Sequence, residues 1–146
     1  MYRNLLVPVD GNELSSKAMR SSIELATQLG ATITAFVAEP LPPPPAIGRP
    51  SDMLLESEEF HARAGRHARQ VLSSFEEQAR AAGVGFAGHF AETADVAEAI
   101  AEAARAHACD MIVMVTHGRG PFGELLFGSQ TKQVMAQTRV PLLVLH

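Results

Sequence analysis

The sequence predicts an α/β fold, with one open parallel sheet and helices on both faces. Short apolar runs typical of buried strands alternate with longer segments whose apolar residues recur every three or four positions, as in helices. This alternation favours parallel strands joined by right-handed crossovers. A length of 146 residues and a hydrophobic content of 47% suit one core, so residues 1–146 are predicted to form a single domain.

The first two strands and the first helix are predicted within the first 37 residues. Leu5–Val9 is a short apolar run followed by a turn, as expected of a buried strand. The next segment has helical spacing, with Asn12 able to cap its start and Gly30 able to end it. Thr32–Val37 is rich in β-branched and aromatic residues and is predicted to be the second strand.

A proline-rich stretch, residues 40–50, follows the second strand. Four consecutive prolines, Pro42 to Pro45, exclude a regular helix and favour a surface excursion over the carboxyl edge of the sheet or a partly disordered loop. From Ser51 the apolar residues again have helical spacing, and this longest helix is predicted to end at Gly83 and Gly85.

Three strands and two helices are predicted in the remainder. Phe86–Phe90 is the third strand, Asp95 caps a helix, and Met111–Val115 is the fourth strand. A last helix begins near Gly128, and Val140–Leu145 is the fifth strand. Ligands of such sheets bind beyond the carboxyl ends of the strands, where the strand order reverses, so the loops after the first, second and fourth strands are the candidate sites.

The charge balance argues against a nucleic-acid partner. The formal net charge is −4, whereas a nucleic-acid surface normally carries a basic face. The local basic run, Arg63, Arg66 and Arg69, lies among glutamates and fits a solvated helix face better than a binding patch.

The cysteine content and the apolar runs indicate the compartment. Cys109 is the single cysteine, so no intrachain disulfide can form, and no Cys/His cluster has zinc-site spacing. The start of the chain lacks the features of an export signal, and no apolar run reaches the roughly 18 to 20 residues of a membrane span. We expect a cytoplasmic protein with no membrane partner and no metal-ligating residues.

The glycine-rich loop after the fourth strand is the strongest candidate site. It runs from His117 through Gly118 and Gly128 to Ser129, where the last helix begins. Glycines let backbone N–H groups approach an anion, and the start of a helix adds unpaired donors and the positive end of its dipole. The loop is therefore predicted to bind phosphate groups.

Two familiar phosphate motifs match this loop only in part. Gly118, Gly120 and Gly123 spell GxGxxG. A dinucleotide fold places this motif after its first strand and at the start of a helix, whereas here it follows the fourth strand and no helix comes directly after it. Gly123, Gly128 and Ser129 spell GxxxxGS, without the lysine that a Walker A loop places on the β and γ phosphates. Fast phosphoryl transfer is not predicted.

The loop resembles the phosphate motif of the nucleotide-binding branch of the universal stress protein family. In that motif a GxxG is followed by nine residues and then by Gly and Ser or Thr, which Gly118, Gly128 and Ser129 match. Residues 6–10 resemble the first-strand signature of the family and Val140–Leu145 its closing strand, so the likeness covers essentially the whole chain. It implies a five-stranded parallel sheet of order 3-2-1-4-5, a homodimer and ATP across the carboxyl edge.

The resemblance also implies roles for individual residues. Asp10 would bind the ribose hydroxyls, because a carboxylate accepts hydrogen bonds from two of them. Apolar side chains would cover the purine, and any Mg²⁺ would be held by the phosphates. The adenine and sugar contacts would be Pro8, Val9, Val37 and Met114, the phosphate contacts Gly118, Arg119, Gly128, Ser129 and Gln130, with Val115 and His117 completing the site.

Val115 departs from the family pattern, because it stands at the first glycine of GxxG. A valine with positive φ is a steric outlier, so the strand is predicted to run further before turning at His117 and Gly118. Two methyl groups then stand where the nucleotide comes close.

Two candidate residues have simpler readings. Asp10 can cap the first helix or fix the preceding turn, alone or together with a ribose contact. His117 lies where a catalytic base can sit, but no nucleophile with an acid partner can be placed near it, so no catalytic residue is predicted.

Three functions fit these observations. The first is a nucleotide-binding regulatory protein with little or no turnover. The second is a stress-linked dimeric adaptor that has lost its nucleotide through Val115 and acts through an unknown protein partner, with Val140–Leu145 as the edge that pairs with its copy. The third, a slow ATP hydrolase, lacks an identifiable base or activating lysine.

Overall fold

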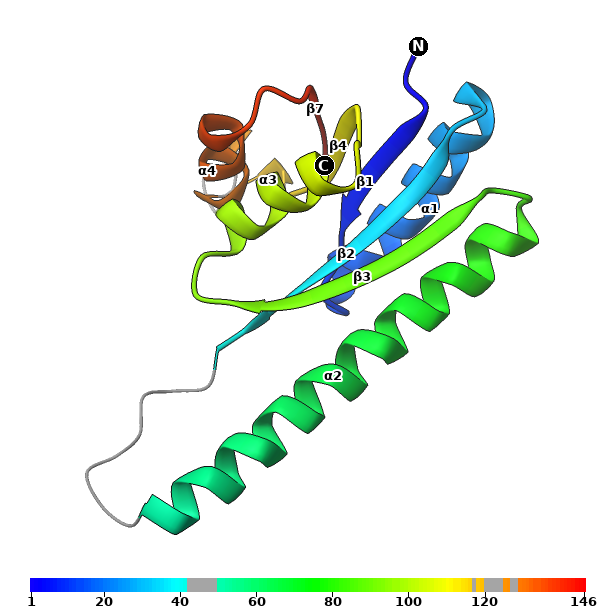
Figure 1. Cartoon of the computed structure of the whole chain (residues 1–146). Helices are drawn as coiled ribbons and strands as arrows, with labels where there is room; N and C mark the ends of the chain where they lie inside the picture. The colour runs from blue at the N-terminus through cyan, green and yellow to red at the C-terminus, as the bar shows by residue number, and fades with distance from the viewer. Residues whose placement is uncertain (42–49, 117, 120–124, 127–128) are drawn as a thin grey trace.

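The described part of the chain folds into seven strands and four helices (Figure 1). The structure is a computed structural model, and it describes residues 1–41, 50–116, 118–119, 125–126 and 129–146. The strands are β1 (Asn4–Pro8), β2 (Thr32–Pro40), β3 (Phe86–Thr93), β4 (Met111–Val115), β5 (Gly118–Arg119), β6 (Leu125–Leu126) and β7 (Leu142–Leu145). The helices are α1 (Glu13–Leu29), α2 (Pro50–Ala81), α3 (Val96–Ala106) and α4 (Ser129–Gln137).

Five parallel strands form the central sheet in the order β3-β2-β1-β4-β7. Strand β1 is central, and the chain moves outward on one side through β2 and β3 and on the other through β4 and β7. The fold class and the strand order 3-2-1-4-5 are thus confirmed. The strand order reverses between β1 and β4, which is where open α/β sheets bind ligands.

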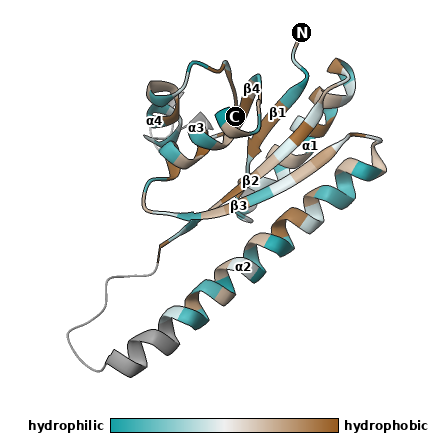
Figure 2. Cartoon of the chain, viewed as in Figure 1, coloured by the Kyte–Doolittle hydropathy of each residue, from teal (hydrophilic) through white to brown (hydrophobic). Residues whose placement is uncertain are grey.

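The hydrophobic core has two layers, one on each face of the sheet. Helices α1 and α2 pack on one face, where Leu5 and Val7 of β1 are buried, and α3 and α4 pack on the other, where Leu6 is buried. Successive residues of a strand point to opposite faces, so a strand covered on both sides is apolar throughout. Figure 2 shows hydrophobic residues concentrated on the central strands, whereas hydrophobic and hydrophilic residues alternate along α2.

The helix boundaries follow the predicted caps. Asn12 caps α1 through its side-chain oxygen, which accepts hydrogen bonds from the N–H groups of Leu14 (2.9 Å) and Ser15 (3.3 Å). Gly30 ends this helix in the left-handed conformation, with φ of 65°. Asp95 caps α3 by accepting from the N–H of Glu98 at 3.0 Å.

Several boundaries differ from the sequence prediction. Strand β2 extends to Pro40 and β3 to Thr93, because their parallel pairing is continuous from Ile33–Phe86 to Pro40–Thr93. Helix α2 begins at Pro50, where the missing N–H would be unpaired in any case. The four-proline run lies within 42–49, outside the described residues.

The C-terminal part shows two further differences. The last strand begins at Leu142 instead of Val140, since its pairing with β4 starts at Ile112. A two-stranded antiparallel pair, β5 with β6, was not predicted, and it joins Gly118 to Leu126 and Arg119 to Leu125. No described helix is long and apolar enough to cross a membrane.

Two stacked histidines join the carboxyl end of α3 to β3. The rings of His89 and His107 lie with centroids 3.8 Å apart and planes 11° from parallel. Burial lowers the pKa of His89, and the nearby charge of His107 lowers it further. The folded state therefore favours neutral His89.

This pair should make the protein less stable in acid. The stabilisation from neutral His89 is complete above its ordinary pKa of about 6.5 and is lost as the pH falls through the lower folded-state pKa. We expect the melting temperature of His89→Phe, which keeps a ring, to fall less than that of the wild type between about pH 7 and about pH 5. His107→Phe should change the pH dependence of the melting temperature less, because it removes the charge of His107 but leaves His89 buried. Equal pH profiles for the wild type and His89→Phe would contradict this expectation.

Candidate functional site

A pocket of about 580 Å³ lies at the carboxyl edge of the sheet, where β1, β2 and β4 end. It spans the switch point between β1 and β4, and its remaining walls come from the N-terminal parts of α1, α3 and α4. Its volume lies within the usual range for small-molecule sites. The lining residues are Pro8, Val9, Asp10, Asn12, Leu14, Ser15, Ala18, Phe36, Ala38, Val96, Ile100, Met114, Val115, Thr116, Gln130 and Thr131.

Of the twelve residues predicted from sequence, six within the described part of the chain line this pocket. They come from the end of β1, the end of β4 and the first turn of α4: Pro8, Val9, Asp10, Met114, Val115 and Gln130. Ser129 begins α4 and is exposed, but it is not among the lining residues. Gly118 and Arg119 form β5, and His117 and Gly128 lie outside the described residues.

Val37 is placed elsewhere by the structure. Its side chain is fully buried in the core on the face that α1 and α2 cover. Because side chains alternate along a strand, its neighbours Phe36 and Ala38 point to the opposite face and line the pocket. The expected side-chain contact from Val37 is therefore replaced by these two residues.

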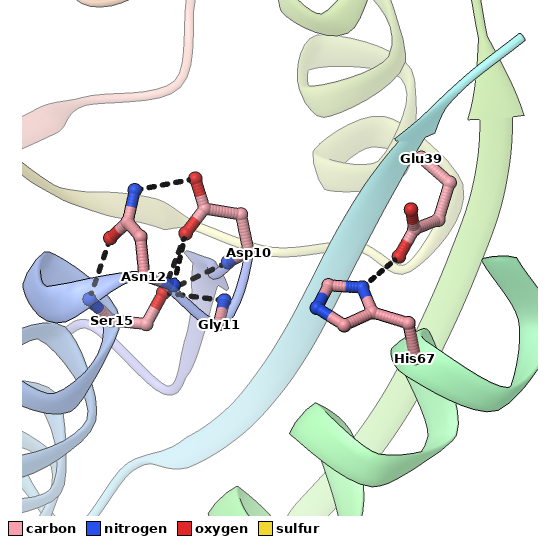
Figure 3. A network of polar contacts seen from close by, with 6 residues as sticks. All are labelled: Asp10, Gly11, Asn12, Ser15, Glu39 and His67. Atoms are coloured by element: carbon pink, nitrogen blue, oxygen red, sulfur yellow. Dashed lines mark hydrogen bonds and ion pairs between the residues drawn. The ribbon is translucent and has the colours of Figure 1, made fainter. Parts of the chain in front are cut away.

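The turn from β1 into α1 is held by a network centred on Asp10 (Figure 3). Its Oδ1 accepts hydrogen bonds from the N–H of Asn12 (2.9 Å) and the hydroxyl of Ser15 (3.0 Å), and its Oδ2 accepts from the amide Nδ2 of Asn12 (2.8 Å). The Ser15 Oγ in turn accepts from the N–H groups of Asp10 (2.9 Å) and Gly11 (3.0 Å). Asp10 thus fixes the turn, while Asn12 caps the helix.

The same network determines what Asp10 can offer a ligand. A carboxylate has about four acceptor positions, and three of those of Asp10 are used within the turn. One position on Oδ2 is left for a hydroxyl, and the residue is exposed. Sequence reasoning missed Asn12 and Ser15 as lining residues, although an aspartate that bonds the backbone two positions on is a common signal of such a turn.

Gly11 is required at this turn for two reasons. Its φ of +87° is a conformation that L side chains rarely adopt. A Cβ at this position would also lie 2.9 Å from Cγ2 of Val71 and 3.0 Å from Nε2 of His67, both on α2. Helix α2 therefore packs directly on the backbone of the turn.

Val115 fits its place in the backbone. It is the last residue of β4 and pairs with Leu145, and the N–H of Thr116 donates to the Leu145 carbonyl at 2.8 Å. Among the described residues the sole non-glycine with positive φ is Ala108. Val115 is thus part of the strand without positive φ, the predicted turn at His117 lies outside the described residues, and Val115 lines the pocket.

Gln130 contributes a buried donor to the pocket. It is the second residue of α4, and its Nε2 has no hydrogen-bond partner within the described structure. Leaving a buried polar group unpaired costs about 1–3 kcal/mol, so a ligand acceptor at this position would remove a penalty. Unpaired backbone N–H groups at the start of the helix favour an anion in the same region.

A second, open groove of about 690 Å³ runs along α3 to the segments that precede β4 and β7. It contains none of the residues predicted to bind a ligand. Its wall is rich in alanine, and Glu102 and Arg105 bind each other there. The pocket at the carboxyl edge is therefore the candidate site.

The fold and the pocket define a small doubly wound α/β protein with a ligand site at the switch point of its sheet. The chain belongs to the universal stress protein family, whose family model matches residues 1–146. A universal stress protein of Thermus aquaticus is 29% identical over 152 residues, covering 100% of both chains. A crystal structure of a family member from Burkholderia pseudomallei is 26% identical, with a TM-score of 0.73 over 99% of this chain and 96% of that one.

Some structural neighbours hold adenine nucleotides. A universal stress protein in complex with cAMP is 23% identical, with a TM-score of 0.70 over 99% of this chain and 97% of its own. Two more distant proteins share the fold. An Archaeoglobus fulgidus universal stress protein with dAMP is 18% identical, with a TM-score of 0.65 over 99% of this chain and 98% of its own. An Arabidopsis thaliana family protein with AMP is 12% identical, with a TM-score of 0.62 over 98% of this chain and 90% of its own.

The close packing at Gly11 predicts an unusually costly substitution. Gly11→Ala should lower the free energy of unfolding by about 2–4 kcal/mol, through backbone strain and overpacking against α2. Gly83→Ala is the matched control, because Gly83 has φ of +74° and nothing within 4 Å of an added Cβ. It should cost about 1 kcal/mol. Urea denaturation of both variants measures the two losses of unfolding free energy. Equal losses would show that the contact with α2 adds nothing to the cost at Gly11.

Proposed function

We propose that this protein binds an adenine nucleotide, ATP, in the pocket at the carboxyl edge and acts as a cytoplasmic regulatory protein with little or no turnover. The observation that carries the proposal is the convergence in one pocket of an apolar wall, an aspartate with a free acceptor and the first turn of a helix. Bound adenine nucleotides in structural neighbours support it.

Each part of the nucleotide has a matching surface. Phe36, Ile100 and Met114 supply apolar surface for the purine. The remaining acceptor of Asp10 suits a ribose hydroxyl, and the start of α4 with the Nε2 of Gln130 suits phosphate oxygens. Gly118, Arg119, Gly128 and Ser129 are proposed to bind the phosphates, in keeping with the family motif.

Magnesium would be carried by the nucleotide. Among the described residues no group of three His, Cys, Asp or Glu side chains could hold a metal, and most of the acceptor capacity of Asp10 is used by its own turn. Phosphate oxygens are the ligands that Mg²⁺ commonly takes in nucleotide sites. A role without turnover fits a site in which no activating lysine was found in the loop.

Calorimetric titration with ATP and magnesium tests this proposal. We expect micromolar binding by the wild type and ATP among the small molecules released when the purified protein is denatured. Val115→Gly should bind about tenfold tighter, since it removes the side chain of a residue that lines the pocket and restores the glycine of the family motif. No binding by the wild type and no ATP in the extract would contradict the proposal.

A second candidate function is a dimeric stress adaptor that works through protein contacts. It is favoured by β7, an edge strand whose four residues are all partly exposed. An apolar edge of this kind is a surface that pairing with a second copy would cover. Binding of ATP gained only by Val115→Gly would favour this function.

The proposed dimer makes its own prediction. The wild type should sediment as a dimer at micromolar concentration. Val144→Lys, which places a charge on the partly exposed strand β7, should shift it to a monomer with an unchanged circular dichroism spectrum. Met135→Lys, at an exposed residue of α4, is the control and should remain dimeric. A wild-type monomer would exclude pairing through β7.

A further inference from the structure

We propose that His67, held by Glu39, is a positioning residue for the nucleotide site, because it supports the turn that carries Asp10. The inference rests on the proposed function, since the ribose contact of Asp10 is what the turn would position. It concerns residues of α2 and β2 that do not line the pocket.

Glu39 fixes the orientation of the His67 ring. The carboxylate lies at the end of β2, on the face opposite to the pocket residue Ala38, and the residue is only 7% exposed. Burying a carboxylate is costly unless it has a partner, and Nδ1 of His67 lies 2.6 Å from its Oε1 (Figure 3). The His67 side chain is 48% exposed, so packing alone does not hold its ring in place.

The oriented ring lies against the turn. With Nδ1 on Glu39, the opposite nitrogen of His67 approaches Gly11, 3.0 Å from where a Cβ would stand. Ser15 holds the same turn from the α1 side by accepting the N–H groups of Asp10 and Gly11. The turn is thus confined between α1 and α2, and loss of the ring would give Gly11, and with it Asp10, room to move.

The protein contains a matched control for this role. His61, also on α2, pairs with Glu92 on β3, and Glu92 is the register neighbour of Glu39. The His61 side chain is 46% exposed, close to the value for His67, but it is not among the atoms nearest Gly11. If these pairs only anchored α2 to the sheet, replacing either histidine would have the same effect at the site.

Calorimetry with ATP and with 2′,3′-dideoxy-ATP separates the two roles. His67→Ala should weaken ATP binding by about three- to tenfold, the loss expected for one hydrogen bond, and leave 2′,3′-dideoxy-ATP within about twofold. His61→Ala should change neither. Glu39→Gln, which keeps an oxygen for Nδ1–H, should retain ATP affinity, whereas Glu39→Ala should behave as His67→Ala.

A measurement without ligand tests the same proposal independently. The amide protons of Asp10 and Gly11 should exchange with solvent faster in His67→Ala than in His61→Ala. Equal exchange in the two variants, or an equal loss of both nucleotides, would overturn the positioning role. If the wild type binds neither nucleotide, the proposed function fails, and the exchange of these two amides alone decides whether His67 supports the turn.

Discussion

The parallel pairing of β1 with both β2 and β4 is the constraint on which the candidate site depends. Because the chain leaves β1 toward β2 on one side and returns to β4 on the other, the connections diverge at the carboxyl end of β1. The pocket lies at this divergence, and its floor is made by the ends of the three strands. The buried residues of β1, fully apolar on both faces, keep this edge in place.

The two faces of the sheet meet at the end of β2. Phe36 and Ala38 point into the pocket, whereas Val37 and Glu39 point toward α1 and α2. The pocket lies across the carboxyl edge, with walls from α1 and from α3 and α4, while the turn that carries Asp10 is also packed from α2. Helix α2, which does not line the pocket, is in this way connected to the Asp10 carboxylate through the packing of His67 and Val71 on Gly11.

Val115 shows how one position serves both the sheet and the site. As the last residue of β4 it gains from β-branching, because a valine suits an extended, paired backbone. At the same position it lines the pocket and packs against the core on the face that α1 and α2 cover. The backbone accommodates the valine without positive φ.

The sequence by itself determined the four helices and the five strands of the central sheet, their succession along the chain and the edge at which a ligand would bind. These features depend on residues close together in the chain, so the sequence contains their signals. Examples are the apolar strands, the N-caps Asn12 and Asp95, and Gly30 at the end of α1. Only the tertiary structure decided which face each strand residue takes, as Val37 and Phe36 show, because that depends on which helix covers which side. It also decided the pairing of Glu39 with His67 across 28 positions and the packing of α2 on Gly11, because no sequence period specifies contacts between separate elements.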